Sequence, residues 1–87
     1  PAEEPAAPLK VQLPSRLVAR VVAEMPVGEG FAPSRIADEV NRRYSRELRK
    51  PIDSRLASTA IRRLMRRGKV RLVAKGTAHR EAIYARS

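Results

Sequence analysis

The chain has no cysteine and no tryptophan, and its 87 residues include a single histidine, His79. Without thiols it can form neither a disulfide nor a thiolate metal site, and one histidine is too few for a zinc centre. It also lacks an apolar run of about 18 residues and, at its N-terminus, the basic-then-apolar order of a signal peptide. We therefore expect no metal, no other cofactor, no membrane association and an intracellular location, in the cytoplasm or nucleoid.

The residue patterns that catalysis requires are also missing. Gly28 and Gly30 are followed by Phe31 rather than by the Lys-Ser or Lys-Thr of a phosphate-binding loop. Asp38 and Glu39 are neighbours in a helical segment, so their side chains diverge by about 100° and cannot face one another as an acid–base pair. The sequence therefore predicts a binding module rather than an enzyme.

Positive charge dominates what is present. Nineteen Lys and Arg against nine Asp and Glu give a net charge of +10. Residues 1–40 hold four basic and six acidic side chains, a sum of −2, whereas residues 41–87 hold fifteen basic and three acidic ones, a sum of +12. This asymmetry indicates a polyanionic partner. An arginine-rich genome composition, or a need for solubility alone, would also produce many arginines.

Residues 1–8, PAEEPAAP, combine three prolines with two glutamates and have no apolar period, so we expect a disordered linker or tail. A linker would make the chain a module of a longer parent protein, and a tail would belong to a complete small one. We expect residues 9–87 to form one domain. Within it, Leu9, Val11 and Leu13 alternate with polar residues, which predicts a short extended segment packed on the domain.

Three segments have apolar residues at helical spacing. Pro14 and Pro33 suit the first positions of two helices, and Gly68 suits the end of a third, which Asp53 or Ser54 can cap. The predicted inward-facing residues are Leu17, Val18, Val21, Val22 and Met25 in the first helix, Ile36, Ala37, Val40 and Tyr44 in the second, and Leu56, Ala57, Ala60, Ile61 and Leu64 in the third.

The third helix, residues 53–68, separates its residues by chemistry. The face opposite the apolar one carries Arg55, Ser58, Thr59, Arg62 and Arg66. Three guanidinium groups flanked by two hydroxyls suit phosphates and base edges. Arg63 and Arg67 lie on the flank, where we expect contact with phosphates or solvent. Arg62–Arg66 and Arg63–Arg67 are like-charged pairs four residues apart, each of which weakens an isolated helix by roughly 0.2–0.5 kcal/mol. A purely structural surface would gain from alternating signs.

After the third helix the apolar period becomes two. Residues 69–75 are predicted to form a strand, residues 76–80 a turn and residues 81–86 a returning strand, which together make a hairpin with a basic tip.

Aromatic residues are few, and their positions favour the core. Phe31, Tyr44 and Tyr84 are the only three, and both tyrosines fall on apolar stripes. We expect them to pack inside rather than to stack on bases, which favours duplex over single-stranded nucleic acid.

Three helices followed by a hairpin resemble the winged helix-turn-helix DNA-binding superfamily. The matching segments are FAPSRIADEV at the second helix, ASTAIRRLMRRGKVRLV from the third helix into the first wing strand, and KGTAHREAIYAR in the wing and return strand. The resemblance implies an α+β fold, a three-helix winged helix-turn-helix with a C-terminal β-hairpin wing. It also implies binding of double-stranded DNA, with the third helix in the major groove and the wing on the backbone or minor groove.

Carried over by position, the resemblance assigns DNA-binding roles on the two elements. On the third helix these residues are Arg55, Ser58, Thr59, Arg62 and Arg66, with Arg63 and Arg67 on its flank; at the wing tip they are Lys75, His79 and Arg80.

Other functions stay open. The link at residues 45–52 is longer than a minimal helix-turn-helix turn and is similar to the extended form of HARE-type winged helices, which are often fused to chromatin proteins and nucleases. Winged helices also serve as docking domains, so binding to an acidic protein partner, within a larger nucleic-acid-processing or regulatory protein, is the alternative. A third possibility is a homodimeric repressor, paired through the first helix and residues 9–13.

Overall fold

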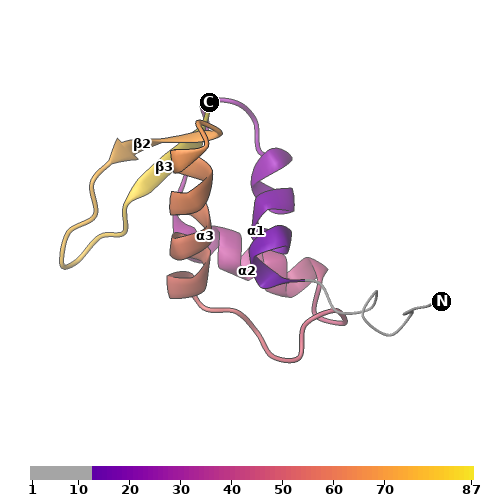
Figure 1. Cartoon of the computed structure of the whole chain (residues 1–87). Helices are drawn as coiled ribbons and strands as arrows, with labels where there is room; N and C mark the ends of the chain where they lie inside the picture. Colours follow the sequence, from indigo (N-terminus) through magenta and orange to yellow (C-terminus); the bar gives the residue numbers. More distant parts are fainter. Residues whose placement is uncertain (1–12) are drawn as a thin grey trace.

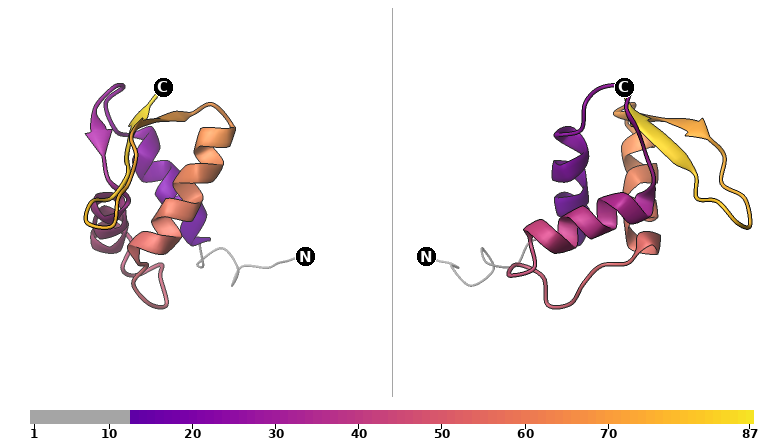
Figure 2. Two further views of the ribbon diagram at one scale, coloured as in Figure 1. Left: turned by 90° about the vertical axis from the view of Figure 1, so that its left-hand side faces the viewer. Right: turned by 180° about the vertical axis from the view of Figure 1, so that it is seen from behind.

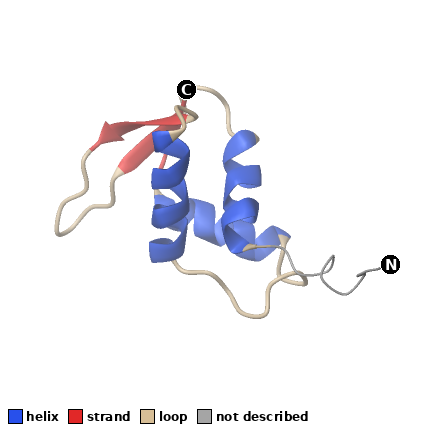
Figure 3. Cartoon of the chain, in the orientation of Figure 1, coloured by secondary structure: helices blue, strands red, loops and turns tan. Residues whose placement is uncertain are grey.

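The computed structural model describes residues 13–87, which form three helices and a three-stranded antiparallel sheet (Figures 1 and 3). The elements follow in the order α1 (Pro14–Ala23), β1 (Gly30–Phe31), α2 (Pro33–Arg43), α3 (Ser54–Arg66), β2 (Val70–Ala74) and β3 (Ile83–Arg86). The predicted α+β class, with three helices and a C-terminal hairpin, is confirmed. The linker predicted at residues 1–8 and residues 9–12 of the predicted extended segment lie outside the described residues.

Prolines begin the first two helices. Pro14 and Pro33 stand in the first turns of α1 and α2, where a backbone N–H would have no intrahelical partner. Both helices bury the stripes predicted for them, except that Met25 and Tyr44 lie beyond the helix ends and are only half-buried against the core. The Arg20 guanidinium lies 6.0 Å from the centre of the Tyr44 ring, a cation–π geometry that occupies this ring within the protein.

Both ends of α3 are set by local chemistry. The Asp53 carboxylate accepts a hydrogen bond of 2.9 Å from the backbone N–H of Leu56, so Asp53 is the N-cap. At the other end, Gly68 has φ of +77°. The N–H of Gly68 donates to the Met65 carbonyl and that of Lys69 to the Leu64 carbonyl, each at 3.0 Å, which is a Schellman motif.

The helices pack around one apolar core. In Figures 1 and 2, α1 and α3 run side by side and α2 crosses them, while the hairpin lies on the side of α3 away from α1. Each of the three helices contacts the other two. Among residues 13–87 every buried side chain is apolar apart from the hydroxyl of Tyr84; the largest of those with almost no exposure are Phe31, Leu17, Ile36, Ile61, Val18, Val21 and Val40.

The sheet contains one strand that the sequence pattern did not predict. Its order is β1-β3-β2, and β1 pairs antiparallel with β3, with Phe31 opposite Tyr84. Phe31 is buried as predicted, and the strand forms because the returning β3 supplies its hydrogen-bonding partner.

One prediction about an apolar side chain was wrong, and the hairpin leaves two others exposed. Leu13 has the predicted extended backbone, but 59% of its surface is exposed instead of packed on the domain. In β2 only Val70 is buried, and both Leu72 and Val73 are largely exposed. The register of the β2–β3 pair shifts between Leu72 and Ala74. Beyond this irregularity the hairpin extends away from the core, so its inward face has no apolar surface to pack against.

Candidate nucleic-acid interface

The outward face of α3 presents the predicted arginines. Arg55, Arg62 and Arg66 are exposed, and so are Arg63 and Arg67 on the flank towards α1. The opposite side of α3 packs on the core through four buried residues at helical spacing: Ala57, Ala60, Ile61 and Leu64. Because the apolar face of α3 packs on the core, the guanidinium groups on the opposite face point to solvent.

The two hydroxyls of this face are less available than the sequence indicates. Ser58 is half-buried, and the Thr59 hydroxyl donates a hydrogen bond of 3.1 Å to the Arg55 carbonyl within the helix. A hydroxyl bonded in this way keeps its lone pairs but has given up its proton as a donor. The arginines are consequently the groups of this face that remain most available to a ligand.

The cations of α3 and the wing have no acidic residue among them in the sequence. From residue 55 to residue 80 there is no Asp or Glu, whereas nine cationic residues occur: Arg55, Arg62, Arg63, Arg66, Arg67, Lys69, Arg71, Lys75 and Arg80. None of these nine forms an ion pair with a carboxylate of residues 13–87. Their charges stay available to an external anion.

Carboxylates on the other side of the molecule are already engaged with arginines of α2. Glu39 accepts hydrogen bonds from Arg42 and Arg43, and these bonds lower the pKa of the Glu39 carboxyl below its usual value. Arg43 also pairs with Glu24, and together the two carboxylates raise the pKa of its guanidinium. Negative charge is thus held near α2, which leaves the field around α3 and the hairpin positive.

The wing tip is built by Thr77 and Gly76. The Thr77 hydroxyl accepts hydrogen bonds from the backbone N–H groups of His79 and Arg80, at 3.3 and 3.1 Å, and its own N–H donates to the Arg80 carbonyl at 2.8 Å. A Cβ at Gly76 would come within 2.9 Å of the Ala82 nitrogen, so this close turn requires glycine. Lys75, His79 and Arg80 are all exposed on it, as predicted.

A contact that the sequence did not reveal anchors the wing to α2. The Glu81 carboxylate accepts a hydrogen bond of 2.9 Å from the Ser34 backbone N–H and a second one from the Ser34 hydroxyl. Ser34 stands in the first turn of α2, which has no side-chain cap of its own from Ala32. Glu81 therefore caps α2 from 47 residues away and holds the return strand beside it.

The link between α2 and α3 is held by an amide clamp and carries further cations. Asn41 donates to the Ile52 carbonyl at 2.9 Å and accepts from the Ile52 N–H at 2.8 Å. Arg46, Arg49 and Lys50 are exposed on this link. None of these three was among the predicted site residues, and neither were Lys69 and Arg71 at the base of the wing.

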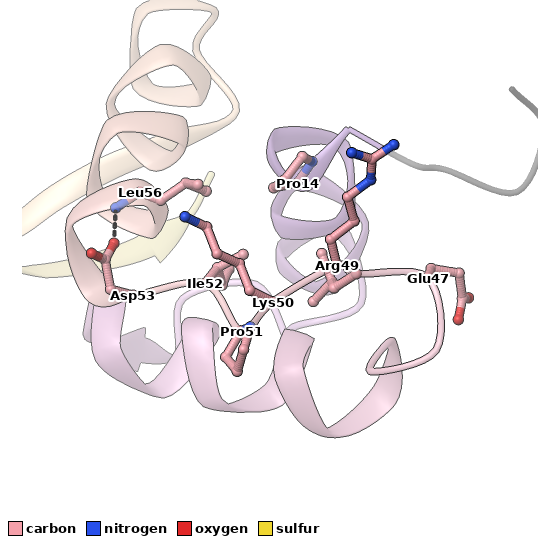
Figure 4. A pocket seen from close by; sticks show the side chains of 9 residues that line it. Pro14, Glu47, Arg49, Lys50, Pro51, Ile52, Asp53 and Leu56 are labelled. Carbon is pink, nitrogen blue, oxygen red and sulfur yellow. Dashed lines mark hydrogen bonds between the residues drawn. The ribbon is translucent and has the colours of Figure 1, made fainter.

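Beside this link a pocket of about 360 Å³ opens between the start of α1 and the start of α3 (Figure 4). Its apolar wall includes Pro14, Leu48, Ile52 and Leu56. Four charged residues also line it: Glu47, Arg49, Lys50 and Asp53. Leu48 packs against the core and lines this pocket.

Residues 13–87 contain no cluster of three or more His, Asp or Glu side chains that could hold a metal ion. No helix within the same residues has the length and apolar character to cross a bilayer.

Comparison of the chain with protein-family models, with characterised proteins and with solved structures gives no significant match.

Proposed function

We propose that this protein binds double-stranded DNA as a member of the winged helix-turn-helix superfamily. In this proposal α3 enters the major groove, and residues 75–80 of the wing contact the backbone or the minor groove. The observation that carries it is the exposed row of Arg55, Arg62 and Arg66 on one helix face, which has no carboxylate partner among residues 13–87.

The dimensions of α3 support major-groove binding. Arg66 follows Arg55 by eleven positions, which corresponds to about 16 Å along a helix axis. A helix fits the major groove of B-DNA, and arginines on its exposed face then reach phosphates at the groove edges and guanine O6 and N7 inside.

The position of Arg55 also favours a binding role over a structural one. It stands in the first turn of α3, where the partial positive charge of the helix N-terminus disfavours a cation by a few tenths of a kcal/mol or more. The Asp53 carboxylate at the N-cap offsets part of this charge, and no acidic side chain follows it in the first turn. A DNA phosphate in contact with the Arg55 guanidinium would offset the remainder.

The proposal includes the position of the protein in the cell and the type of activity. Binding to DNA places the protein inside the cell, at the nucleoid, and the proposed activity is binding without catalysis. Regulation of transcription by occupancy of a site is the function most compatible with such a module.

A mobility-shift comparison tests the proposal. At low salt the 87-residue chain should retard a random duplex more strongly than single-stranded DNA or RNA of equal length, since the few aromatic side chains are engaged in or against the core. The double variant Arg62→Ala/Arg66→Ala should lose most of this binding, and the charge-matched double variant Arg16→Ala/Arg46→Ala should lose little. Equal binding to all three nucleic acids, or equal losses in the two variants, would contradict the proposal.

A further inference from the structure

The pocket beside the α2–α3 link is a second surface with its own chemistry. Pro14 from α1, Leu56 from α3, and Leu48 and Ile52 from the link form its apolar lining. Leu56 and Leu48 are only half-buried, so apolar surface is open to a ligand here. A neighbouring pocket of about 430 Å³ shares Pro14 and Leu56 and adds the 59% exposed Leu13, which continues the apolar surface along the seam between α1 and α3.

Cations stand at the edge of this apolar surface. In Figure 4 the side chains of Arg49 and Lys50 extend from the link on the same side, whereas Glu47 points away. Neither cation forms an ion pair with a carboxylate of residues 13–87. The nearby Asp53 carboxylate is committed to the Leu56 N–H as the cap of α3. Glu47 and Asp53 also line the pocket. Because Glu47 points away and Asp53 accepts the Leu56 N–H, the charged groups directed towards a ligand at this edge are the two cations.

This combination fits a peptide better than it fits DNA. Phosphates would be attracted by Arg49 and Lys50, but a sugar–phosphate backbone has no aliphatic group to fill a pocket lined by proline, leucine and isoleucine. An acidic segment with leucine-like side chains satisfies both features, because its aliphatic groups leave water while its carboxylates meet the cations.

We propose that this pocket binds an acidic peptide segment of another protein, with one aliphatic side chain between Pro14, Ile52 and Leu56 and carboxylates at Arg49 and Lys50. The site is distinct from the face of α3 that carries Arg62 and Arg66. It gives the module a means of docking on a protein partner, and it stands whether or not that face binds DNA.

The test uses a fluorescein-labelled synthetic peptide, DDLDDLLDDL, and a control of equal charge in which every leucine is serine, DDSDDSSDDS. Fluorescence anisotropy measures both affinities on the full chain, and amide NMR shifts locate the bound peptide. The variants are Lys50→Glu, at the pocket edge, and Arg46→Glu, the same charge change on the same link at a residue that does not line the pocket. Both residues are exposed, so both variants should fold.

The leucine peptide should bind saturably, shift the amides of Leu48, Ile52 and Leu56, and lose about tenfold in affinity when leucine is replaced by serine. Lys50→Glu should weaken binding at least about fivefold and Arg46→Glu less than about twofold. The site is disproved if the serine peptide binds equally well, if the two variants lose equally, if no saturable binding occurs, or if a DNA duplex shifts the amides of Leu48 and Ile52 as the peptide does. A rise in peptide affinity in Glu3→Gln/Glu4→Gln would identify the chain's own acidic segment as the occupant and overturn docking of another protein.

Discussion

At the residue scale, Asp53 and Gly68 set the two ends of α3, and together with its apolar stripe they determine which arginines the helix exposes. The cap at Asp53 sets where the helix begins, and the left-handed backbone at Gly68 sets where it ends and the wing begins. Between these two points the angular position of every side chain follows from helix geometry. The exposure of Arg62 and Arg66 on one face is thus a consequence of two end residues and one apolar stripe.

Arg62 is the single arginine whose loss should be most informative. On the tightest-binding duplex obtained from a random pool, Arg62→Ala should weaken binding by about 1–3 kcal/mol, because a guanidinium in the major groove makes paired hydrogen bonds to a guanine. Isothermal titration measures the loss. Arg16→Ala on α1 is the control, and a loss no larger than that of this control would exclude α3 as the contact surface.

Gly68 should be sensitive to any side chain. At φ of +77°, Gly68→Ala places a Cβ in a left-handed conformation, which we expect to lower the free energy of unfolding by about 1–2 kcal/mol. No atom lies within 4 Å of the added Cβ, so the effect is conformational rather than steric. Urea denaturation measures it, and Gly68→Asn should lose less because asparagine tolerates this backbone. Equal losses in the two variants would refute this explanation.

At the scale of elements, the position of the wing depends on contacts far apart in sequence. The hairpin meets β1 through Phe31 and Tyr84, and it meets α2 through Glu81 and Ser34. These contacts hold the return strand, while the exposed Leu72 and Val73 show that β2 gains little from the core beyond its first residue. The wing is consequently attached mainly through one strand.

Removal of the Glu81 carboxylate should test this attachment. Glu81→Ala takes away the cap of α2, and we expect the free energy of unfolding to fall by about 0.5–2 kcal/mol. Thermal unfolding followed by circular dichroism measures the change. Ser34→Ala removes the hydroxyl contact but keeps the backbone N–H contact, so its loss should be smaller. A larger loss in Ser34→Ala than in Glu81→Ala would show that the carboxylate does not act as a cap.

The ion pairs of α2 make stability depend on pH. Because Arg42 and Arg43 lower the pKa of Glu39 in the folded protein, this carboxylate stabilises the fold above its unfolded pKa, near pH 4.5. That stabilisation should disappear as pH falls through the lowered folded pKa. Urea midpoints between pH 6 and 3 should therefore decline less steeply in Glu39→Gln than in the native chain. Asp38→Asn, a neighbour with no ion pair within residues 13–87, should keep the native slope; the same flattening in both variants would contradict the assignment.

At the scale of the whole molecule, charge is divided between two sides. Glu24, Glu29 and Glu39, near α1 and α2, are paired with arginines, and the nine cations of residues 55–80, which have no ion pair within residues 13–87, are left to attract an external polyanion. Their attraction extends over roughly 8–10 Å at physiological salt, so the surface should act as one field as well as a set of contacts.

The salt dependence of duplex binding measures this field. If six to eight cationic groups neutralise phosphates, log Kobs should fall with log salt at a slope between about −5 and −7. The double variant Arg62→Ala/Arg66→Ala should reduce the magnitude of the slope by about two. Titration of a fluorescent duplex across salt concentrations gives both values, and binding that barely responds to salt would exclude phosphate neutralisation as its source.

Much of the helical framework followed from sequence alone. The residues at the helix ends, Pro14, Pro33, Asp53 and Gly68, act on neighbours within about four residues, and the apolar stripes reflect a fixed period, so both can be predicted without knowledge of the fold. The exposed arginines of α3 were predictable for the same reason. Local patterns did not reveal β1, because a two-residue strand has no period of its own and exists only beside a partner.

The sequence by itself determined three helices, a hairpin and a one-sided distribution of charge, since each depends on short-range periodicity or on composition. Tertiary structure alone decided that Glu81 caps α2, that Asn41 clamps Ile52, that Leu13 stays exposed, and that a pocket opens between three segments of the chain. These features join residues up to 47 positions apart, and such pairs are selected by how the core packs as a whole rather than by any signal in the residues between them.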